Sequence, residues 1–476
     1  MLRVYNTLTR EKEEFKPLVP GKVSIYCCGV TPYNDPHIGN ARPFVTWDVV
    51  RRYLEKKGYA VRYVQNFTDI DDKIIRRAKE AGETWKELAD HCIEAYFKVM
   101  DALNVRRADI YPRVSEHIAD VIAVVEKLIE KGYAYALEGD VYYSVERFAG
   151  YGKLSGRSLD DMQAGARVGV DERKHHPMDF ALWKAAKPGE PFWESPWGKG
   201  RPGWHIECST MSMKYLGETF DFHGGGSDLI FPHHENEIAQ AQACTGDDNS
   251  FARYWLHNGF ITIHDEKMSK SKNNFFTVKD ILEKYAGEVV RFFIVQTHYR
   301  SPLDFTDERL AEAKTSLARL KNSWDNAAEL LRRKDEGSDS AKALLAAALE
   351  AKAAFDEAMD DDFNTALAVS HLFSLSKEIN SYYNDVTTGS VAFDAANFAK
   401  ARAVYAEMAE IIGIFEAKEE KADDGLVESL MELLLALRQK AREEKNWALA
   451  DHLRDELKAR GVIIEDTPQG ARWKRA

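Results

Sequence analysis

A strand, a turn, a helix and a second strand follow one another between Lys22 and Thr68, and this order constrains the fold more than any other feature of the sequence. The run KVSIYCCGV is apolar and β-branched, as in a buried strand, and TPYNDPHIGN is rich in turn residues. We predict an amphipathic helix from about Ala41 to Lys57 and a strand in VRYVQNFT. Short connections between such elements form a right-handed parallel unit, so a doubly wound sheet begins here.

A second segment repeats this order after an interruption. TFDFHGGGSD is predicted to be a strand ending in a glycine loop, HHENEIAQAQACT a helix, and WLHNGFITI another strand. We therefore predict a split, doubly wound (Rossmann-type) α/β sheet whose halves are residues 1–111 and 201–306. Residues 112–200, with one helix near His117 to Lys131, are predicted to be an insertion between the halves.

The rest of the chain is predicted to be helical. From Asp307 onward the sequence has almost no proline and shows long helical periods, which indicates an all-α bundle over residues 307–415. The charged run EAKEEKADD is a predicted linker. Residues 425–476 read as a helix pair with a short tail and form a small C-terminal domain. They hold Lys and Arg in near balance with Asp and Glu, whereas the whole chain carries a net charge of −12, so any attraction to nucleic acid must be local.

Composition and the absence of long apolar runs indicate the cellular compartment of the protein. Five scattered cysteines cannot form a disulfide framework in a chain of 476 residues and suit a reducing compartment. The start MLRVYNTLTREKEEF has no apolar stretch of a targeting peptide, and no apolar run reaches the length of a bilayer. We expect a cytoplasmic protein without membrane contact.

The run HHENE suggests a metal site. On a helix, His233 and Glu237 are four residues apart and share one face. Zinc binds cysteine, histidine and carboxylate ligands, and two cysteines follow predicted strands or turns that approach the same sheet edge. The candidate ligands are Cys28, Cys208, His233 and Glu237. Since neighbours on a strand point to opposite faces, at most one of Cys27 and Cys28 serves a site, and spacing alone also allows His234 with Cys27.

Two further runs suit phosphate binding. In EKMSKSKNN, lysines alternate with serines in a loop that could hold several anionic oxygens as mobile point charges; Lys267 and Lys270 are the candidates. In PHIGN, His37 and Asn40 stand at a predicted helix N-terminus, and Gly39 lets the backbone approach a ligand. A helix N-terminus favours phosphate.

PHIGN after the first strand and KMSKS after the last strand of a split sheet are similar to the paired signatures of class I aminoacyl-tRNA synthetases. The runs NFTDIDDKI, RPGWHIECS, DFHGGGSDLIFPHHENEIAQ and MDDDFNTA resemble the cysteinyl-tRNA synthetase family in particular, and the similarity covers essentially the whole chain. The resemblance implies ATP-dependent attachment of L-cysteine to its tRNA, with Mg²⁺ accompanying ATP. One departure is visible, because Asn40 occupies the fourth position of the HIGH signature; its amide can still donate a hydrogen bond.

The resemblance also implies roles for individual residues. It selects among the metal ligands that spacing left open, and implies zinc held by Cys28, Cys208, His233 and Glu237. It implies catalytic contacts to phosphate from His37, Asn40, Lys267 and Lys270. The ATP site would also include Gly39, Gly226 and Asp228, and the amino acid site Gly29, Thr68, Trp204 and His223. The bundle and the C-terminal domain would bind tRNA, with Trp447 and Trp473 as candidate stacking platforms, and we expect a monomer.

Zinc would explain selectivity in such an enzyme. Cysteine and serine differ little in size, a difference worth about 1–3 kcal/mol to an apolar pocket. A coordinated thiol is deprotonated outright, and thiolate is a favoured zinc ligand, so the metal distinguishes sulfur from oxygen. The insertion shows no second catalytic signature, which fits an enzyme that does not need hydrolytic editing.

Three rival functions are separable. A ligase that passes activated cysteine to an amino sugar would lack the tRNA-reading tail. A zinc hydrolase would use Glu235 or Glu237 as general base, but it has no need for KMSKS, and HHENE lacks the two histidines four residues apart that HExxH has. A catalytically silent RNA-binding paralogue would have broken signatures, whereas His37, Lys267, Lys270 and the zinc set are intact.

Overall fold

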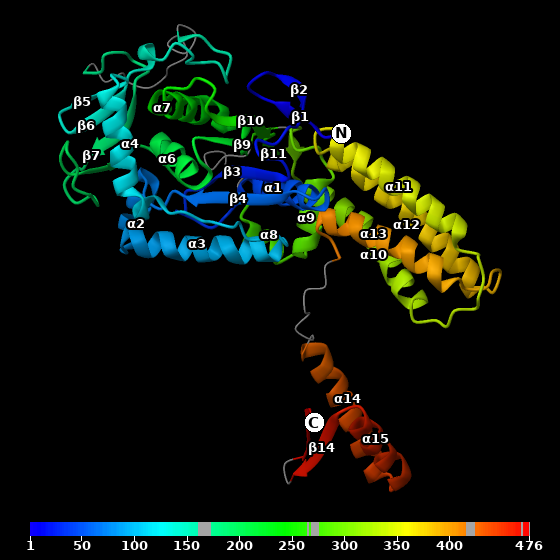
Figure 1. Ribbon diagram of the computed structural model, residues 1–476. Helices are drawn as coiled ribbons and strands as arrows, with labels where there is room; N and C mark the ends of the chain where they lie inside the picture. Colours follow the sequence, from blue (N-terminus) through cyan, green and yellow to red (C-terminus); the bar gives the residue numbers. More distant parts are fainter. Residues whose placement is uncertain (160–172, 264–265, 268–275, 416–423, 468–469, 476) are drawn as a thin grey trace. The chain divides into compact units, whose positions relative to one another are not determined.

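The computed structural model describes residues 1–159, 173–263, 266–267, 276–415, 424–467 and 470–475 (Figure 1). The chain divides into two compact units, residues 1–415 and residues 416–476. The predicted run KMSKS falls mostly outside the described residues, as does the predicted linker up to residue 423. In the described part of the chain, no helix is both long and apolar enough to cross a membrane.

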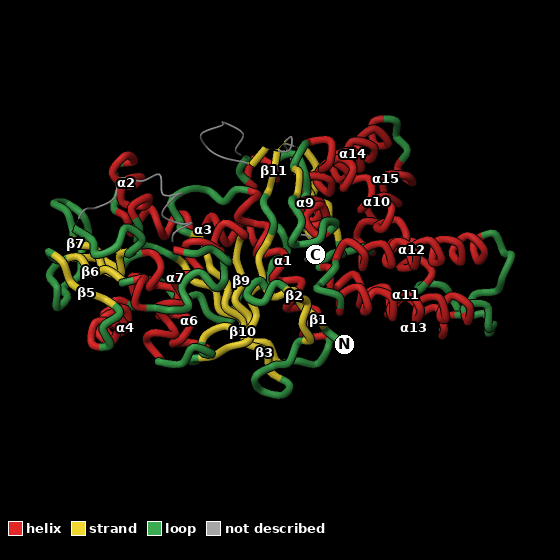
Figure 2. Tube along the Cα trace, turned by 90° about the horizontal axis from the view of Figure 1, so that it is seen from above, coloured by secondary structure: helices red, strands yellow, loops and turns green. Residues whose placement is uncertain are grey.

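The first unit is built around a four-stranded parallel sheet with the order β10-β9-β3-β4. Its strands are β3 (Lys22–Val30), β4 (Ala60–Phe67), β9 (Thr219–Gly226) and β10 (Phe251–Asn258). The chain runs outward from β3 to β4 and later returns to the other side of β3 with β9. Figure 2 shows the strands of this sheet side by side, with β3, β9 and β10 labelled. The order of the strands therefore reverses between β3 and β9, where ligands bind in open α/β sheets.

Helices cover both faces of this sheet. Helices α1 (Ile38–Lys56) and α3 (Trp85–Ala102) pack on the face that holds Ile25 and Cys27. Helices α4 (Ile118–Glu130), α6 (Trp204–Leu216) and α7 (Glu235–Thr245) pack on the face that holds Tyr26 and Cys28. Figure 1 shows α3 on one side of β3 and β4, and α6 and α7 on the other. Because side chains alternate along β3, the two neighbouring cysteines enter different cores.

Helix α1 begins at Ile38, three residues before its predicted start. His37 is the N-cap: its side chain accepts a hydrogen bond from the backbone N–H of Asn40, and the side chain of Asn40 accepts one from the backbone N–H of His37. This reciprocal capping box uses His and Asn in place of the usual Ser or Thr and Glu, so the sequence pattern predicted a start that lies about one turn too late.

The predicted glycine loop in DFHGGGSD is wrong, since Gly224, Gly225 and Gly226 all lie inside β9. A Cβ atom on Gly224 would lie 2.0 Å from the ring of Trp47 on α1, so glycine here allows the helix to pack closely on the sheet. The predicted single strand WLHNGFITI is also interrupted, into β10 and β11 (Ile261–Ile263). Strand β11 pairs with β12 (Glu266–Lys267) and β13 (Leu303–Asp304).

The insertion contains the predicted helix, α4, and a sheet that was not predicted. Four short antiparallel strands form it, in chain order: β5 (Ala134–Leu137), β6 (Asp140–Tyr143), β7 (Phe180–Ala185) and β8 (Gly200–Pro202). The carboxylate of Asp72, at the start of α2 (Asp72–Ala81), pairs with Lys184 on β7 and with Arg201 on β8. These contacts fix the insertion to the helix that follows β4.

Helices follow the sheet to the end of the first unit; those from Asp307 onward were predicted, whereas the two shorter helices before it were not. They are α8 (Val278–Leu282), α9 (Gly287–Val295), α10 (Asp307–Leu330), α11 (Lys342–Asp360), α12 (Thr365–Thr387) and α13 (Ala395–Ile412). The buried carboxylate of Asp48 on α1 accepts hydrogen bonds from Arg52 (2.7 Å) and from Arg291 on α9 (2.6 Å). Arg291 also donates to the backbone oxygen of Ile412, which joins the bundle to α1.

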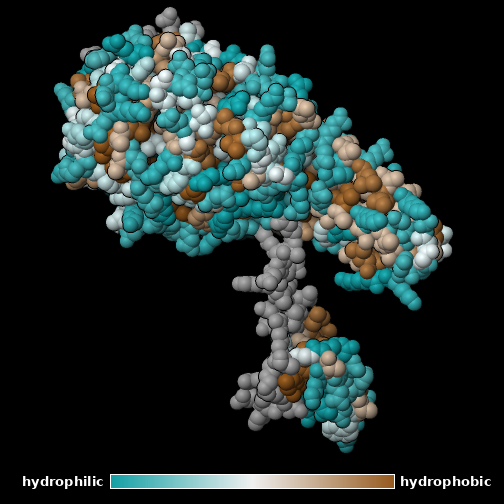
Figure 3. Space-filling view, in the orientation of Figure 1, coloured by the Kyte–Doolittle hydropathy of each residue, from teal (hydrophilic) through white to brown (hydrophobic). Residues whose placement is uncertain are grey.

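Two short strands at the start of the chain, β1 (Arg3–Asn6) and β2 (Glu11–Glu14), form an antiparallel pair in this unit. The surface of the bundle in Figure 3 shows hydrophobic side chains between hydrophilic ones. Leu349 on α11 and Leu367 on α12 are among the exposed large hydrophobic residues of the unit.

The second unit contains the two predicted helices, α14 (Asp424–Glu443) and α15 (Trp447–Ala459). The predicted short tail is wrong, because β14 (Val462–Thr467) and β15 (Gly470–Arg475) form an antiparallel hairpin. Ile464 lies opposite Trp473 in its register. Trp447, at the first position of α15, is 57% exposed, so its ring is not part of a core.

Candidate active site and metal centre

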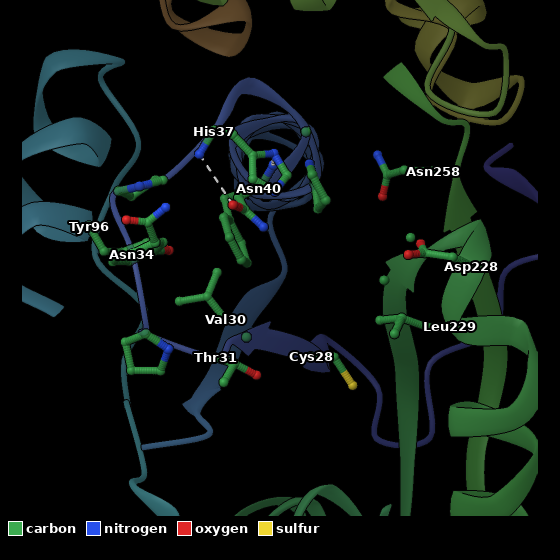
Figure 4. A pocket seen from close by; sticks show the side chains of 18 of the residues that line it. Cys28, Val30, Thr31, Asn34, His37, Asn40, Tyr96, Asp228, Leu229 and Asn258 are labelled. Atoms are coloured by element: carbon green, nitrogen blue, oxygen red, sulfur yellow. Dashed lines mark hydrogen bonds between the residues drawn. The ribbon is translucent and has the colours of Figure 1, made fainter. Parts of the chain in front are cut away.

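A cavity of about 400 Å³ opens where the strand order of the large sheet reverses. Its walls come from the loop after β3, the first turn of α1, the end of β9, the segment after β10 and helix α3. The predicted site residues that line it are Cys28, Gly29, His37, Gly39, Asn40, Trp204, Gly226 and Asp228. Figure 4 shows His37 and Asn40 between two groups of lining residues, with Asp228 and Asn258 on one side and Asn34 and Tyr96 on the other.

The first turn of α1 presents polar groups to this cavity. The backbone N–H of His37 donates to Oδ1 of Asn40 (3.2 Å), and the backbone N–H of Asn40 donates to Nδ1 of His37 (3.3 Å). The first bond orients the amide of Asn40 so that its NH₂ group is turned away from His37, as Figure 4 shows. A donor is therefore retained at the position where the HIGH signature has its second histidine.

Gly29 at the cavity is required by close approach, because a Cβ there would lie 1.6 Å from the backbone oxygen of Asn66. A Cβ on Gly226 would lie 2.4 Å from Oδ1 of Asp228, an exposed side chain that can move away. The backbone N–H of Gly29 donates to Oδ1 of Asn66 (2.9 Å). Asp228 itself lies in the short helix η3 (Ser227–Leu229) with its side chain exposed.

The four predicted metal ligands meet behind the cavity, and one ligand atom from each lies within 4.8 Å of the others. Sγ of Cys28 is 3.7 Å from Sγ of Cys208 and 3.4 Å from Oε1 of Glu237. Nε2 of His233 is 3.0 Å from the same carboxylate oxygen. Cys28 lies two residues before the end of β3, Cys208 lies on α6, and His233 precedes α7, so the fold brings together three distant parts of the chain.

A second group of four ligand atoms overlaps the first. It consists of Cys28, His223, His234 and Glu237. Nε2 of His234 is 3.3 Å from Sγ of Cys28, so the geometry also allows His234, in place of His233, as a metal ligand. Cys27 belongs to neither group and packs in the core on the opposite face of the sheet, which removes the alternative that combined it with His234.

Other side chains hold these groups in place. His223 Nε2 is 2.8 Å from Oε2 of Glu237, and the Nδ1 atoms of His205 and His233 are 2.8 Å apart. The ring of Trp204 stacks on His233 at 4.3 Å between centroids. His234 Nδ1 is 2.8 Å from Nε2 of His257. His223 was predicted in the amino acid pocket, but it is not among the residues that line the cavity; its contact is with Glu237.

Electrostatics favour anionic ligands at two positions. A hydrogen bond from the Cys28 thiol lowers the pKa of Cys208 to about 6. Burial alone would raise the pKa of Glu237, but His223 and His233 outweigh it and lower that pKa to about 2. Burial also raises the pKa of Cys28 well above its usual value. The chain thus gathers acidic groups in a buried pocket where a divalent cation would stabilise their charged forms.

The donor set fits zinc. Two thiols, an imidazole and a carboxylate are the ligand types that Zn²⁺ prefers, and four ligands suit its tetrahedral coordination. Contacts from His223 and His205 to Glu237 and His233 are of the kind that orient metal ligands in proteins.

The remaining predicted residues lie apart from the cavity or outside the described residues. Thr68 is buried and its hydroxyl donates to Oε2 of Glu207 (3.0 Å), without lining the cavity. Lys267 ends β12, opposite Thr262 of β11. Lys270 lies outside the described residues.

Sequence reasoning missed several buried polar residues around the metal group. Glu207 precedes a predicted ligand, and burial raises its pKa well above the usual value. His257 follows a run of aromatic residues on β10, and Nδ1 of its ring is 2.8 Å from the hydroxyl of Thr7. A histidine directly after the apolar run Tyr254, Trp255 and Leu256 was the signal that could have identified His257.

Comparison with known proteins agrees with this geometry. Three protein families match the chain. The family described as "tRNA synthetases class I (C) catalytic domain" matches residues 14–315, the "DALR domain" family matches residues 354–416, and the "Cysteinyl-tRNA ligase anticodon binding domain" family matches residues 426–473. The cysteine–tRNA ligase of Heliobacterium modesticaldum is 56% identical, with 100% of both chains covered. The cysteine–tRNA ligase of Thermococcus onnurineus is 54% identical over 100% of this chain and 99% of its own.

Solved structures confirm the predicted fold class. The Mycobacterium tuberculosis methionyl-tRNA synthetase in complex with methionyl-adenylate aligns with a TM-score of 0.59 at 16% identity, covering 82% of this chain and 89% of its own. A leucyl-tRNA synthetase (LeuRS) of Agrobacterium radiobacter K84 aligns with a TM-score of 0.61 at 11% identity, covering 84% and 85%. The full-length match, the catalytic-domain match and this fold show that the chain belongs to the cysteine–tRNA ligase family of class I aminoacyl-tRNA synthetases.

Proposed function

We propose that this enzyme activates L-cysteine with ATP and transfers it to the tRNA for cysteine. The observation that carries the proposal is the position of the Cys28, Cys208, His233 and Glu237 group directly behind a cavity whose wall includes the capped turn of His37 and Asn40. A group that can select sulfur therefore lies beside one that can bind phosphate.

The four residues of that group would hold one zinc ion. When bound, zinc supplies a soft Lewis acid that a substrate thiolate ligates far more strongly than a serine hydroxyl does. Cys28 and Trp204 border both the cavity and the metal group, so the substrate's side chain would enter between them. We propose that His223 orients Glu237 and that Gly29, which lines the cavity, contacts the amino acid through its backbone.

Activation requires the carboxylate of cysteine to attack the α-phosphorus of ATP, which forms cysteinyl-adenylate and releases pyrophosphate. The chain's contribution is to position the phosphates and to stabilise charge on their oxygens. His37 and Asn40, at the N-terminus of α1, are placed for this role, and Asp228 with Gly226 is placed for the ribose. We propose that Lys267 and Lys270 contact the pyrophosphate and that Mg²⁺ accompanies ATP.

The second step passes the acyl group to the terminal ribose of tRNA, at its 2′-hydroxyl by analogy with class I enzymes. We assign residues 307–415 and 425–476 to the tRNA, with phosphate contacts for register and stacking for unpaired bases. The exposed ring of Trp447 and the ring of Trp473 on the hairpin remain candidates for stacking. We expect a cytoplasmic monomer.

The rival functions fit the molecule less well. Both carboxylates proposed for a hydrolase are engaged: Glu235 accepts hydrogen bonds from the backbone of Leu154 and Ser155, and Glu237 contacts His223 and His233. An amino-sugar ligase has no use for residues 426–473, which match an anticodon-binding domain.

Exchange of pyrophosphate into ATP tests the proposal. The purified enzyme is expected to catalyse exchange with cysteine and to discriminate against serine by more than the roughly 200-fold that an apolar pocket could give. Charging of a transcribed tRNA with the cysteine anticodon, compared with an amino sugar as acceptor, tests the second step. Equal exchange with serine, or transfer to the amino sugar alone, would contradict the proposed function.

A further inference from the structure

A buried cation on α1 contacts one wall of the cavity from behind. This wall is formed by residues 258–261, which lead from β10 into β11 and line the cavity, and Figure 4 shows Asn258 on the same side as Asp228. Arg42 lies on α1 two residues after Asn40, is 1% exposed and does not line the cavity. Its side chain therefore acts on the wall and not on a ligand.

The guanidinium of Arg42 donates four hydrogen bonds, all of them to backbone oxygens. One terminal nitrogen donates to Gly259 (2.8 Å) and Phe260 (2.9 Å) in the wall. The other donates to His298 (3.2 Å) and Ser301 (2.5 Å), in the loop between α9 and β13. A guanidinium holds its donors in a rigid planar fork, so these bonds fix the helix, the wall and the loop relative to one another.

The loop of residues 298–301 is itself held from two sides. On the side of the wall, the backbone N–H of Gly259 donates to the backbone oxygen of Tyr299 (2.8 Å). On the other side, the buried carboxylate of Asp362, between α11 and α12, accepts from the hydroxyl of Tyr299 (2.8 Å) and from Nε of Arg300 (2.6 Å). The wall therefore cannot move away from α1 without breaking buried hydrogen bonds.

The stability of α1 does not explain a cation at this position. Within the described part of the chain, Arg42 forms no ion pair, whereas Arg52 and Arg291 share the carboxylate of Asp48. Burial lowers the pKa of Arg42 to about 10, so the guanidinium is still charged at neutral pH. A buried charge without a counterion is costly, and a cation near a helix N-terminus opposes the helix dipole. The effect that offsets this cost is the geometry that the four bonds impose on the cavity.

We propose that Arg42 is a positioning residue for ATP, because it fixes the spacing between the phosphate-binding turn of α1 and the wall of residues 258–261. The inference rests on the proposed function, which assigns His37 and Asn40 to the phosphates and Asp228 to the ribose. ATP would then reach from α1 towards this wall. A shift of the wall by about 1 Å would misplace the α-phosphorus relative to the attacking carboxylate.

Arg42→Met removes the fork and keeps an unbranched side chain. The affinity for ATP, measured by equilibrium titration, and kcat/KM for ATP in pyrophosphate exchange are expected to fall by about 10- to 100-fold, as for a misplaced reactant. KM for cysteine and the metal content should stay at the parent values, since none of the four oxygens that Arg42 binds belongs to the metal group.

Two further variants separate geometry from charge and from folding. Arg42→Lys keeps the charge but not the fork, and should lose nearly as much ATP affinity as Arg42→Met. Gly259→Ala keeps Arg42, but its Cβ would lie 2.4 Å from the backbone oxygen of Ser301. It should displace the wall from the loop and weaken ATP binding by about 10-fold.

Arg52→Met is the matched control. Arg52 is also buried on α1 and donates to the backbone oxygens of Asn104 and Glu410, and none of these three residues lines the cavity. This variant is expected to lower the Tm and to bind ATP as the parent enzyme does. A defect that is specific to ATP would then follow the contact with the wall and not the loss of a buried arginine.

Several outcomes would overturn the inference. Parent-like ATP affinity in Arg42→Met would do so, as would equal weakening for ATP and cysteine or loss of metal, which would show a general structural role. Parent-like affinity in Arg42→Lys would show that charge matters and geometry does not. If Arg42→Met does not fold, parent-like ATP affinity in Gly259→Ala overturns the inference. A parent enzyme that binds ATP but lacks cysteine-dependent exchange would instead refute the proposed function, and the titrations would still test Arg42; a parent enzyme that does not bind ATP would refute both.

Discussion

Cys208, His233 and Glu237 are at most 2% exposed, whereas His37 and Asn40, in the same crevice, are only partly buried and Asp228 is exposed. The buried group is held by contacts with neighbouring side chains: His223 contacts Glu237, and His205 contacts His233. In the open group, His37 and Asn40 are held by one capping box. Under the proposed function, the difference teaches that a fixed group would select the amino acid, while the open wall would accommodate large, charged substrates that arrive and leave.

Removing a ligand from the buried group should have the largest effect. Cys208→Ala is expected to lose the bound metal and to lower cysteine-dependent exchange by more than about 1000-fold, because several kcal/mol of metal contact are lost. Metal analysis and exchange assays measure both. Cys244→Ala, a buried free cysteine outside the metal group, is the control. A Cys208→Ala protein with a full complement of metal would show that Cys208 is not needed for metal binding, and would contradict the role given to the buried group.

The open group should show its strongest effect at His37. His37→Ala removes a cap and the proposed phosphate contact, and exchange is expected to fall by about 100- to 1000-fold, as when one donor to a developing charge is lost. Metal content should not change, since His37 is not one of the residues of the metal group. Loss of metal together with activity would mean that the two groups form one structural unit.

A residue behind the metal group should have an intermediate effect. His223→Leu leaves Glu237 without its 2.8 Å partner, and metal affinity is expected to fall by about 10- to 100-fold. Titration with a competing chelator measures the affinity directly. Unchanged affinity would show that the contact between His223 and Glu237 is incidental to metal binding.

The smallest effect is expected at Asn40. Water can replace its amide at the partly open wall, so Asn40→Ala should slow exchange by only about 3- to 10-fold, the worth of one ordinary hydrogen bond. Thermal unfolding should show whether loss of the capping box contributes. A loss as large as that of His37→Ala would mean that the amide contacts the transition state as closely as the imidazole does.

Long apolar runs made the parallel sheet predictable, since strands buried on both faces have eight or nine residues. The sheet of the insertion could not be predicted in this way, because β5 to β8 have three to six residues and one of them is GRP. The terminal hairpin was missed because β15 is the charged sequence GARWKR, which becomes a strand only when it pairs with β14.

Alternation on β3 predicted that only one of Cys27 and Cys28 serves the site, but it could not tell which, because both faces of the strand are buried. The answer depends on where α6 and α7 pack. His233 and His234 pose a similar problem: they are adjacent, both lie within 4 Å of Oε1 of Glu237, and spacing therefore does not distinguish them.

Cys28 borders the cavity, whereas Cys208, His233 and Glu237 do not. An ion held by these four residues would exchange with solvent past Cys28, through the space that the amino acid fills. A working enzyme would then shield its own ion from chelators, and an idle one would release it sooner. Cells short of zinc would, on this view, keep the ion longest in the molecules that are charging tRNA.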